Sequence, residues 1–205
     1  MKKLKTDKKS IMNIDRLIPV LLEQRSITAN SNGQRTSVRI KRPSWKDVYE
    51  GYPKSGNNDR SADLVFSALL GENYDRKTFA NACATRVSLG LLNGKMSVRK
   101  DFEIQKGDFK GKGFIASAGS LKKWLEKESV WGAPDVEVPE PSNITAVANK
   151  INEGKIKNGV YIIIGGFGGG VTGHATLWIG ANKDVIGGHN YVDYGGSVYF
   201  WELID

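Results

Sequence analysis

The chain has 205 residues, of which 40% are hydrophobic, 25% charged and 9% aromatic, a composition that predicts one well-buried core rather than a disordered chain. Its 30 basic and 22 acidic residues give a formal net charge of +8, which favours anionic partners without selecting one. We expect neither a membrane span nor a cleavable signal peptide, because apolar runs such as residues 17–22 are short.

Residues 1–42 are polar, rich in lysine and arginine, and weakly patterned. We interpret them as a basic N-terminal arm, in which residues 14–22 are apolar enough to dock as a short helix. From residue 43 onward the apolar residues recur at regular spacing. Residues 43–205 are therefore predicted to form one folded domain.

Helical spacing dominates the middle of the chain. Trp45, Val48 and Tyr49 lie at helical spacing, and Pro53 marks the end of that helix. Capping and spacing signals predict further helices at residues 61–71, 81–93, 120–128 and 142–153.

The last third of the chain has the period of strands. Residues 160–164 are typical of a buried strand, residues 174–179 alternate like a half-buried strand, and residues 197–204 would close the sheet. Because helices precede strands, the order predicts an α+β fold with helices packed on an antiparallel sheet.

Cys83 is the only cysteine, so an internal disulfide is excluded. It lies at the start of the helix predicted at residues 81–93, with Asn81 as a candidate cap. The N–H groups and the positive end of the helix dipole would lower its pKa below the free value of about 8.5 and favour the nucleophilic thiolate. The alternative is a small core residue, because Cys83 shares a helical face with Val87 and Leu91.

The chain has two histidines, His174 and His189. Alternation along residues 174–179 places His174 on the less apolar face of its strand, where an imidazole could act as base for a thiolate on a helix. A histidine without a catalytic role, satisfied by its surroundings, is the alternative.

Gly168, Gly170 and Gly173 match the dinucleotide-binding pattern G-x-G-x-x-G. That motif must open a helix in a parallel βαβ unit, whereas a strand follows here. We therefore expect no cofactor, and interpret the glycines as a mobile hairpin loop beside His174. A single cysteine and two histidines also lack the spacing of a zinc site, so no metal is expected.

Several segments, in this order, resemble the fourth family of type VI secretion amidase effectors: PSWKDVYEGYP, NACATRVSLGLL, FIASAGSLKKWLEKESVWGAPD, TGHATLWIG and the closing VYFWEL. The resemblance covers residues 43–205. Cysteine followed by Ala-Thr-Arg, paired later with Gly-His-x-Thr-Leu-Trp, is specific as a combination, whereas either piece alone is weak.

The resemblance implies a papain-like, NlpC-type cysteine amidase domain at residues 43–205. Its substrate would be peptidoglycan stem peptides, cut at the amide between γ-D-glutamate and diaminopimelate, with Cys83 as nucleophile and His174 as base. The resemblance also implies export by the type VI secretion machinery, action in the periplasm of a target bacterium, and a cognate immunity protein that protects the producer. Neither a nucleic acid partner nor membrane insertion is expected.

The chain departs from the family pattern at one place, after His174. The family has an orienting acid about eleven positions beyond the histidine, often between two cysteines, whereas this chain offers Asp184 one position early and has no cysteine there. Asp184 is the predicted third catalytic residue, with His189 and Asp193 as alternatives; an ordinary solvated turn residue is the other interpretation of Asp184.

Two other functions stay open at this point. One is a basic binding module for wall glycan or nucleic acid, in which Cys83 is structural. The other is a transamidase of the same fold, which would pass the acyl group to an amine instead of water.

Overall fold

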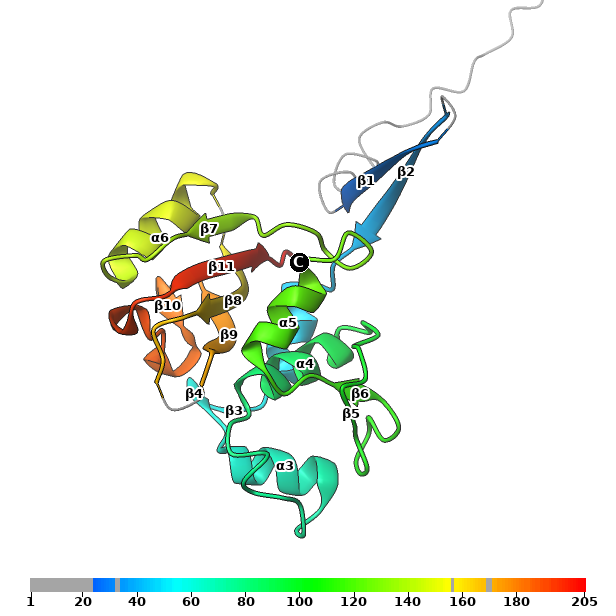
Figure 1. The fold of residues 1–205 in the computed structure, drawn as a ribbon, viewed down its shortest axis with the longest axis vertical. Coiled ribbons are helices and arrows are strands. Elements are labelled where there is room, and N and C mark those ends of the chain that lie inside the picture. Colours follow the sequence, from blue (N-terminus) through cyan, green and yellow to red (C-terminus); the bar gives the residue numbers. More distant parts are fainter. Residues whose placement is uncertain (1–23, 32–33, 156, 169–170) are drawn as a thin grey trace, which may run out of the picture. The chain divides into compact units, whose positions relative to one another are not determined.

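The computed structural model describes residues 24–31, 34–155, 157–168 and 171–205. The chain divides into two compact units, Met1–Lys41 and Arg42–Asp205. In the first unit, β1 (Gln24–Ser31) and β2 (Gln34–Lys41) form an antiparallel hairpin (Figure 1). The docking helix predicted at residues 14–22 lies outside the described residues.

The hairpin differs from the weakly patterned arm expected from the sequence. Its sequence signal is the dipeptide Asn32-Gly33 between the two strands, because Asn-Gly favours the tight turns that join antiparallel strands. Two residues are too few to produce a periodic pattern, which is the main sequence signal of a strand. The arm therefore contains regular structure that composition did not predict.

The second unit is built around a five-stranded sheet with the order β10-β9-β8-β11-β7. Every neighbouring pair in it is antiparallel, which confirms the predicted α+β class. Its strands are β7 (Val136–Val138), β8 (Asn158–Ile164), β9 (Gly173–Ile179), β10 (Asp184–Val185) and β11 (Ser197–Glu202). The edge strands β7 and β10 were not predicted, because two or three residues are too few to show alternation.

The five predicted helices are all present, with ends shifted by a few residues. They are α2 (Trp45–Gly51), α3 (Ala62–Leu70), α4 (Cys83–Asn93), α5 (Ala118–Leu125) and α6 (Ile144–Glu153). Four of them are preceded by a residue whose side chain caps the first turn: Ser44, Ser61, Ser117 and Asn143. Within the described residues, no helix is long and apolar enough to cross a membrane.

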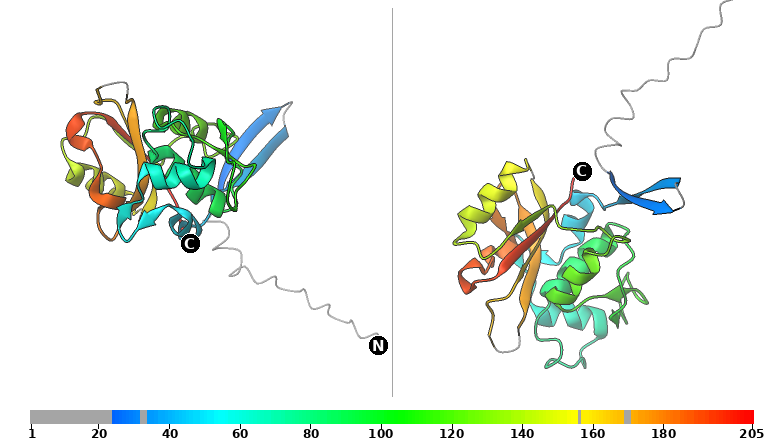
Figure 2. Two further views of the ribbon diagram at one scale, coloured as in Figure 1. Left: turned by 90° about the horizontal axis from the view of Figure 1, so that it is seen from below. Right: turned by 45° about the horizontal axis from the view of Figure 1, so that its top comes forward.

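The helices cover both faces of the sheet (Figure 2, right). On one face, α6 packs in a cluster that includes Val147, Ile151, Tyr161, Trp178 and Phe200. On the other, α4 contacts β9, and α5 contacts β8 and β9. Residues 173–178 are consequently all buried, so the prediction of a half-buried strand there is wrong: a strand covered by helices on both sides has no solvent face.

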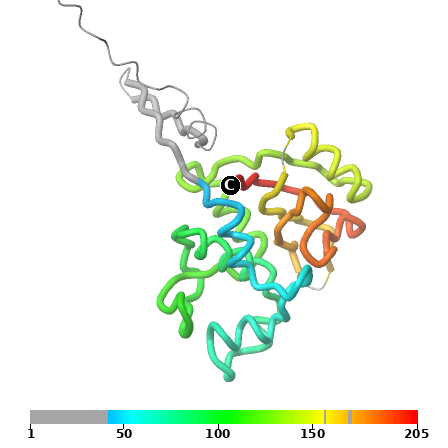
Figure 3. The backbone as a smooth tube through the Cα atoms, turned by 180° about the vertical axis from the view of Figure 1, so that it is seen from behind, coloured from blue at the N-terminus to red at the C-terminus, as the bar shows by residue number. Residues whose placement is uncertain are grey.

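Short elements close the region beside β9. The hairpin of β3 (Lys54–Ser55) and β4 (Asn58–Asp59) is joined to the 3-10 turn η2 (Ile186–Gly188), because the Gly187 N–H donates to Asn57 O at 2.7 Å. Figure 3 shows from behind how the segment after β9, orange to red, folds back beside the sheet before it enters β11.

A second hairpin, of β5 (Phe102–Glu103) and β6 (Gly113–Phe114), lies between α4 and α5 in the chain. The 3-10 turn η3 (Val192–Tyr194) precedes β11. Neither element has a counterpart among the sequence predictions, since both are too short for a periodic signal.

Helix α4 approaches α2 closely at Gly90. A Cβ atom added there would lie 2.7 Å from Val48 O and 3.0 Å from Val48 Cγ1. Because the nearer of these atoms belongs to the backbone, it cannot swing aside. Gly90 therefore fixes the distance between the two helices.

We expect Gly90→Ala to lower the free energy of unfolding by about 1–3 kcal/mol, because overpacking forces a backbone shift. Urea unfolding would measure it. The matched control is Gly119→Ala in α5, where an added Cβ meets nothing closer than 3.7 Å and the helix should gain stability. Equal effects of the two substitutions would contradict this account of the α2–α4 contact.

Candidate active site

Cys83 is the first residue of α4, and its side chain is buried. The N-cap position of α4 is Ala82, without a side-chain cap, so the prediction of Asn81 as the cap is wrong. Asn81 lies one residue earlier, and its Oδ1 accepts a hydrogen bond from the Cys83 N–H at 2.9 Å. The backbone N–H groups of Ala175 and Ala84 are directed at the sulfur. Since Ala175 follows His174 in β9, this contact brings the thiol to the strand position next to the predicted base.

Burial raises the pKa of the Cys83 thiol, and this effect exceeds the lowering by the Ala175 and Ala84 N–H groups and by the charge of Arg86. The prediction of a lowered pKa is therefore wrong for this structure. The N–H groups at the helix start do lower the pKa, as expected. The free energy needed to remove a thiolate from water is larger than the stabilisation that two N–H groups provide. The group at rest is the neutral thiol.

His174 is the second residue of β9 and only 6% exposed. Its Nε2 atom is buried and has no hydrogen-bond partner within the described part of the chain. Burial, followed by the charges of Arg86 and His189, lowers the pKa of His174 to about 3. The imidazole is thus neutral at pH 7 and able to accept a proton.

A buried polar network joins the elements around this pair, and the sequence analysis missed it. Arg86, one turn after Cys83, forms an ion pair with Asp59 at 3.3 Å. Tyr52 donates to Asp59 Oδ1 at 2.8 Å and lies 3.2 Å from Thr176 Oγ1. Burial, followed by the charge of Asp59, raises the pKa of Tyr52 well above its usual value, so the phenol keeps its proton.

Through these contacts the network connects the end of α2 with β4, α4 and β9, next to the candidate pair. The available sequence signal was Arg86 itself, a charged residue on an otherwise buried helix, because buried charges are almost always paired. Its partner Asp59 lies 27 positions away, and only the tertiary structure identifies it.

The structure does not bring Asp184 to the imidazole. Asp184 pairs with Ile179, five residues beyond His174 along β9, which at about 3.3 Å per residue is roughly 16 Å. Its Oδ1 accepts from the Val185 N–H at 2.7 Å and from Asn190 Nδ2 at 3.1 Å. The carboxylate therefore holds the loop that follows β10.

The two alternatives also make no hydrogen bond to His174 within the described residues. His189 is near enough for its charge to affect His174, and its ring stacks on Tyr191 with centroids 6.0 Å apart. Asp193 is exposed in η3. The ring that does touch His174 is that of Tyr191, at 4.8 Å between centroids and 67° between planes. No sequence pattern singled out Tyr191.

The glycine-rich segment joins β8 to β9, which are antiparallel neighbours paired up to Ile164↔Gly173, as expected for a hairpin connection. Gly166 has φ +75, and a Cβ there would lie 2.0 Å from Gly195 O. Glycine is thus required where this connection passes the turn before β11. No group of three or more His, Cys, Asp or Glu side chains in the described residues could hold a metal ion.

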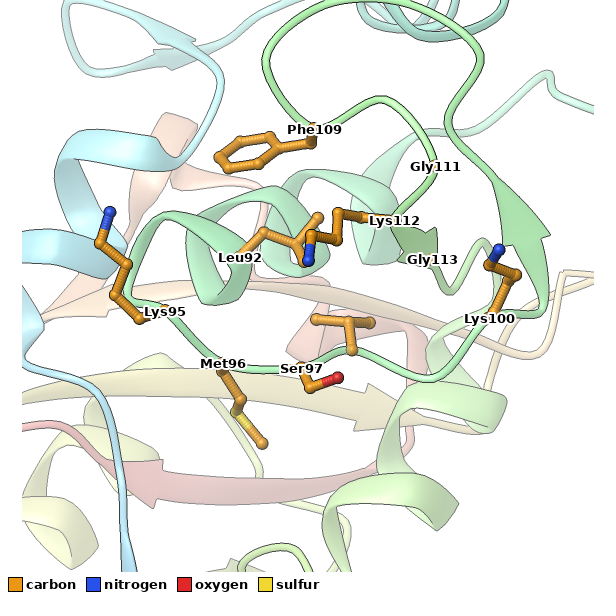
Figure 4. Close-up of a pocket in the computed structure, with 10 residues that line it drawn as sticks. Leu92, Lys95, Met96, Ser97, Lys100, Phe109, Gly111, Lys112 and Gly113 are labelled. Atoms are coloured by element: carbon orange, nitrogen blue, oxygen red, sulfur yellow. The ribbon is translucent and has the colours of Figure 1, made fainter.

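A cavity of about 500 Å³ lies at the other end of α4 (Figure 4). Its walls contain three lysines, an aromatic ring and backbone: Leu92, Lys95, Met96, Ser97, Val98, Lys100, Phe109, Gly111, Lys112 and Gly113. Leu92 is nine residues from Cys83, or about 14 Å along the helix. This cavity therefore does not hold the bond that Cys83 would attack.

A family model described as type VI secretion system (T6SS), amidase effector protein 4, matches residues 79–201. Similar solved structures include the Tae4-Tai4 effector-immunity complex from Salmonella Typhimurium, with 22% identity, a TM-score of 0.59, and coverage of 80% of this chain and 99% of that one. The corresponding complex from Enterobacter cloacae has 23% identity, a TM-score of 0.59, and coverage of 79% and 99%.

The crystal structure of the type VI effector Tae4 from Enterobacter cloacae has 21% identity, a TM-score of 0.60, and coverage of 80% and 98%. At these identities the structural likeness establishes the fold alone. No curated protein shows a significant sequence match to the chain.

The neutral, buried His174 predicts acid sensitivity. Its pKa is about 3 when folded and about 6.5 when unfolded, so its contribution to stability is present above about pH 6.5 and is lost as the pH falls toward 3. Between pH 7 and 4 the loss should be about 3 kcal/mol. Urea unfolding at each pH should show a flatter dependence for His174→Gln than for the wild type. His189→Gln controls for removal of a histidine as such, and an unchanged slope in His174→Gln would refute the prediction.

The raised pKa of the Cys83 thiol predicts its alkylation profile. Because Cys83 is the only cysteine, the iodoacetamide reaction reports on this residue alone. We expect the midpoint of rate against pH to be higher in the native protein than in the same protein unfolded in urea. A native midpoint at or below the unfolded one would contradict the raised pKa and support the thiolate that the sequence predicted.

Proposed function

The chain belongs to the family of type VI secretion system amidase effector protein 4, and we propose that it is a cysteine-dependent endopeptidase of peptidoglycan stem peptides. The bond cut would be the amide between γ-D-glutamate and diaminopimelate. The single observation that carries the proposal is the contact of the Cys83 sulfur with the backbone N–H beside His174. Residues 79–201, which match the family, contain both side chains.

We assign Cys83 as nucleophile and His174 as base. Both are neutral at rest, so the thiol proton passes to His174 as the sulfur attacks the amide carbon. The imidazolium then gives this proton to the departing diaminopimelate amine, leaving a γ-glutamyl thioester on Cys83. Water, losing a proton to His174, hydrolyses the thioester and restores the thiol.

Nδ1 is the imidazole nitrogen that we assign to this proton, because Nε2 is buried. The mechanism also needs a hydrogen-bond donor for the oxyanion. The Cys83 N–H cannot stabilise the oxyanion while it donates to Asn81 Oδ1 at 2.9 Å. Rotation of the Asn81 side chain would have to release it, since a donor must aim at the developing charge.

For Asp184 we propose a positioning role instead of a direct bond to His174. Its carboxylate accepts from Asn190 Nδ2, and Asn190 precedes the Tyr191 ring that packs on His174. Asp184 would thus act on the base through the loop. The loss of the family's flanking cysteines fits this displacement of the acid.

The papain-like, NlpC-type assignment is likewise our proposal. It is supported by a cysteine at the start of a helix that packs on an antiparallel sheet, with a histidine on the strand that the helix meets. We also propose that residues 43–205 carry the whole hydrolytic activity, because none of the candidate site residues lies in the basic arm at residues 1–42.

The proposed partners follow from the family. Similar effectors are solved with an immunity protein, and we propose that a cognate immunity protein binds this chain in the producing cell. The type VI secretion machinery would export it, and the periplasm of the target bacterium would be its place of action.

We expect Cys83→Ala to reduce the release of soluble stem fragments from purified sacculi by at least about 1,000-fold, because no other described group can form the thioester. Mass spectrometry would read the fragments and the bond cut. The nearly isosteric Cys83→Ser should be equally inactive, and an unfolding midpoint near that of the wild type shows that the fold is kept.

The same digest separates the other functions. Near wild-type cleavage by Cys83→Ala would overturn the mechanism. Retention of wild-type protein on sacculi without cleavage would indicate a binding module, and incorporation of an added amine into the product would indicate a transamidase.

A further inference from the structure

The backbone at Tyr191 is in the left-handed region, with φ 58 and ψ 20. A bulky residue seldom adopts this conformation, because its Cβ crowds the following carbonyl. Such a conformation persists only where surrounding contacts impose it, and it occurs most often at functional sites.

Hydrogen bonds on both sides hold Tyr191 in place. Asn190 O accepts from the Tyr161 hydroxyl at 2.8 Å, and Asn190 Nδ2 donates to Asp184 Oδ1 at 3.1 Å. Asn190 Oδ1 accepts from the Val192 N–H at 3.2 Å. The loop therefore presents the Tyr191 ring in one fixed direction.

That ring is the centre of an aromatic cluster beside the base. It packs edge to face with His174 at 4.8 Å and with Phe167 and Tyr194 at 5.5 Å each. Phe167 and Tyr194 also stack on each other. Packing against the cluster limits rotation of the Tyr191 side chain, so its contact with the imidazole is maintained.

His174 needs such a partner. Its Nε2 atom is buried without a hydrogen bond to the described residues, and Arg86 and His189 both oppose a positive charge on its ring. No carboxylate hydrogen-bonds to it within the same residues. An aromatic face carries partial negative charge, accepts an N–H and attracts a cation.

We propose that Tyr191 is the positioning residue of His174: its ring keeps the proton on Nε2, leaves Nδ1 free to take the proton of Cys83, and stabilises the imidazolium that results. This inference rests on the proposed roles of Cys83 and His174. It gives the function of the missing orienting acid to an aromatic ring that Asp184 and Asn190 hold in place.

Kinetics on a soluble stem peptide test the role of the ring. Tyr191→Leu should lower kcat roughly 5- to 30-fold, the size of a desolvated cation–ring attraction, with KM unchanged. Tyr191→Phe, which keeps the ring face, should rescue most of that loss. Tyr194→Leu, which removes a ring that packs on Tyr191 but makes no contact with His174, should lower kcat less than Tyr191→Leu does.

Stability separates positioning from simple packing. Tyr191→Gly removes the ring but suits the left-handed backbone, so it should lose as much kcat as Tyr191→Leu while unfolding at a higher urea concentration than Tyr191→Leu. If kcat instead followed the unfolding midpoint across the three variants, Tyr191 would be only structural and the proposal would fall.

Imidazole ¹⁵N spectra give a readout that does not need turnover. The chain has two histidines, so His189→Gln assigns the His174 signals. We expect the tautomer with hydrogen on Nε2 in the wild type, and in Tyr191→Leu a mixture of tautomers with a lower His174 pKa. A higher His174 pKa in Tyr191→Leu would mean that the ring only shields the imidazole from water, and would overturn the proposal.

These measurements distinguish failure of the inference from failure of the proposed function. If the wild type does not cleave sacculi, the proposed function fails, whereas the spectra still decide whether Tyr191 sets the tautomer of His174. If the wild type cleaves and Tyr191→Leu has a wild-type kcat and tautomer, the inference alone fails.

Discussion

The contact between the first turn of α4 and β9 is the interaction on which the site depends. It places the Cys83 sulfur against the Ala175 N–H and so brings Cys83 to the strand that carries His174, 91 positions away in the sequence. Gly90 permits the approach of α2 to α4, and the Arg86–Asp59 ion pair joins α4 to β4. Each of these contacts fixes the position of the helix that carries the thiol.

The same contact explains why both groups are neutral at rest. Packing α4 on the sheet removes the thiol and the imidazole from water, and desolvation favours the uncharged form of each. In the proposed mechanism, proton transfer must therefore accompany the attack by the thiol. Burial also raises the electrostatic influence of whatever lies beside the imidazole, which is why the ring of Tyr191 and the charge of Arg86 matter there.

The loop from Asp184 to Tyr194 connects Asp184 to the imidazole of His174 indirectly. Asp184 lies at the far end of β9 from His174 by register, but its carboxylate fixes Asn190. Asn190 in turn fixes the residue whose ring meets the imidazole. In this arrangement Asp184 helps to fix the Tyr191 ring without touching the imidazole of His174.

The sequence by itself determined the α+β class, the five helices, the three long strands and the candidate pair Cys83 and His174, because helical and strand periods and a distinctive motif are local properties. It could not reveal that β9 is covered on both faces, that burial outweighs the helix dipole at Cys83, or that Asp184 lies opposite Ile179. Strand register, desolvation and the partner of a buried charge are set by residues distant in sequence. Only the tertiary structure therefore placed Asp59 beside Arg86 and Tyr191 against His174.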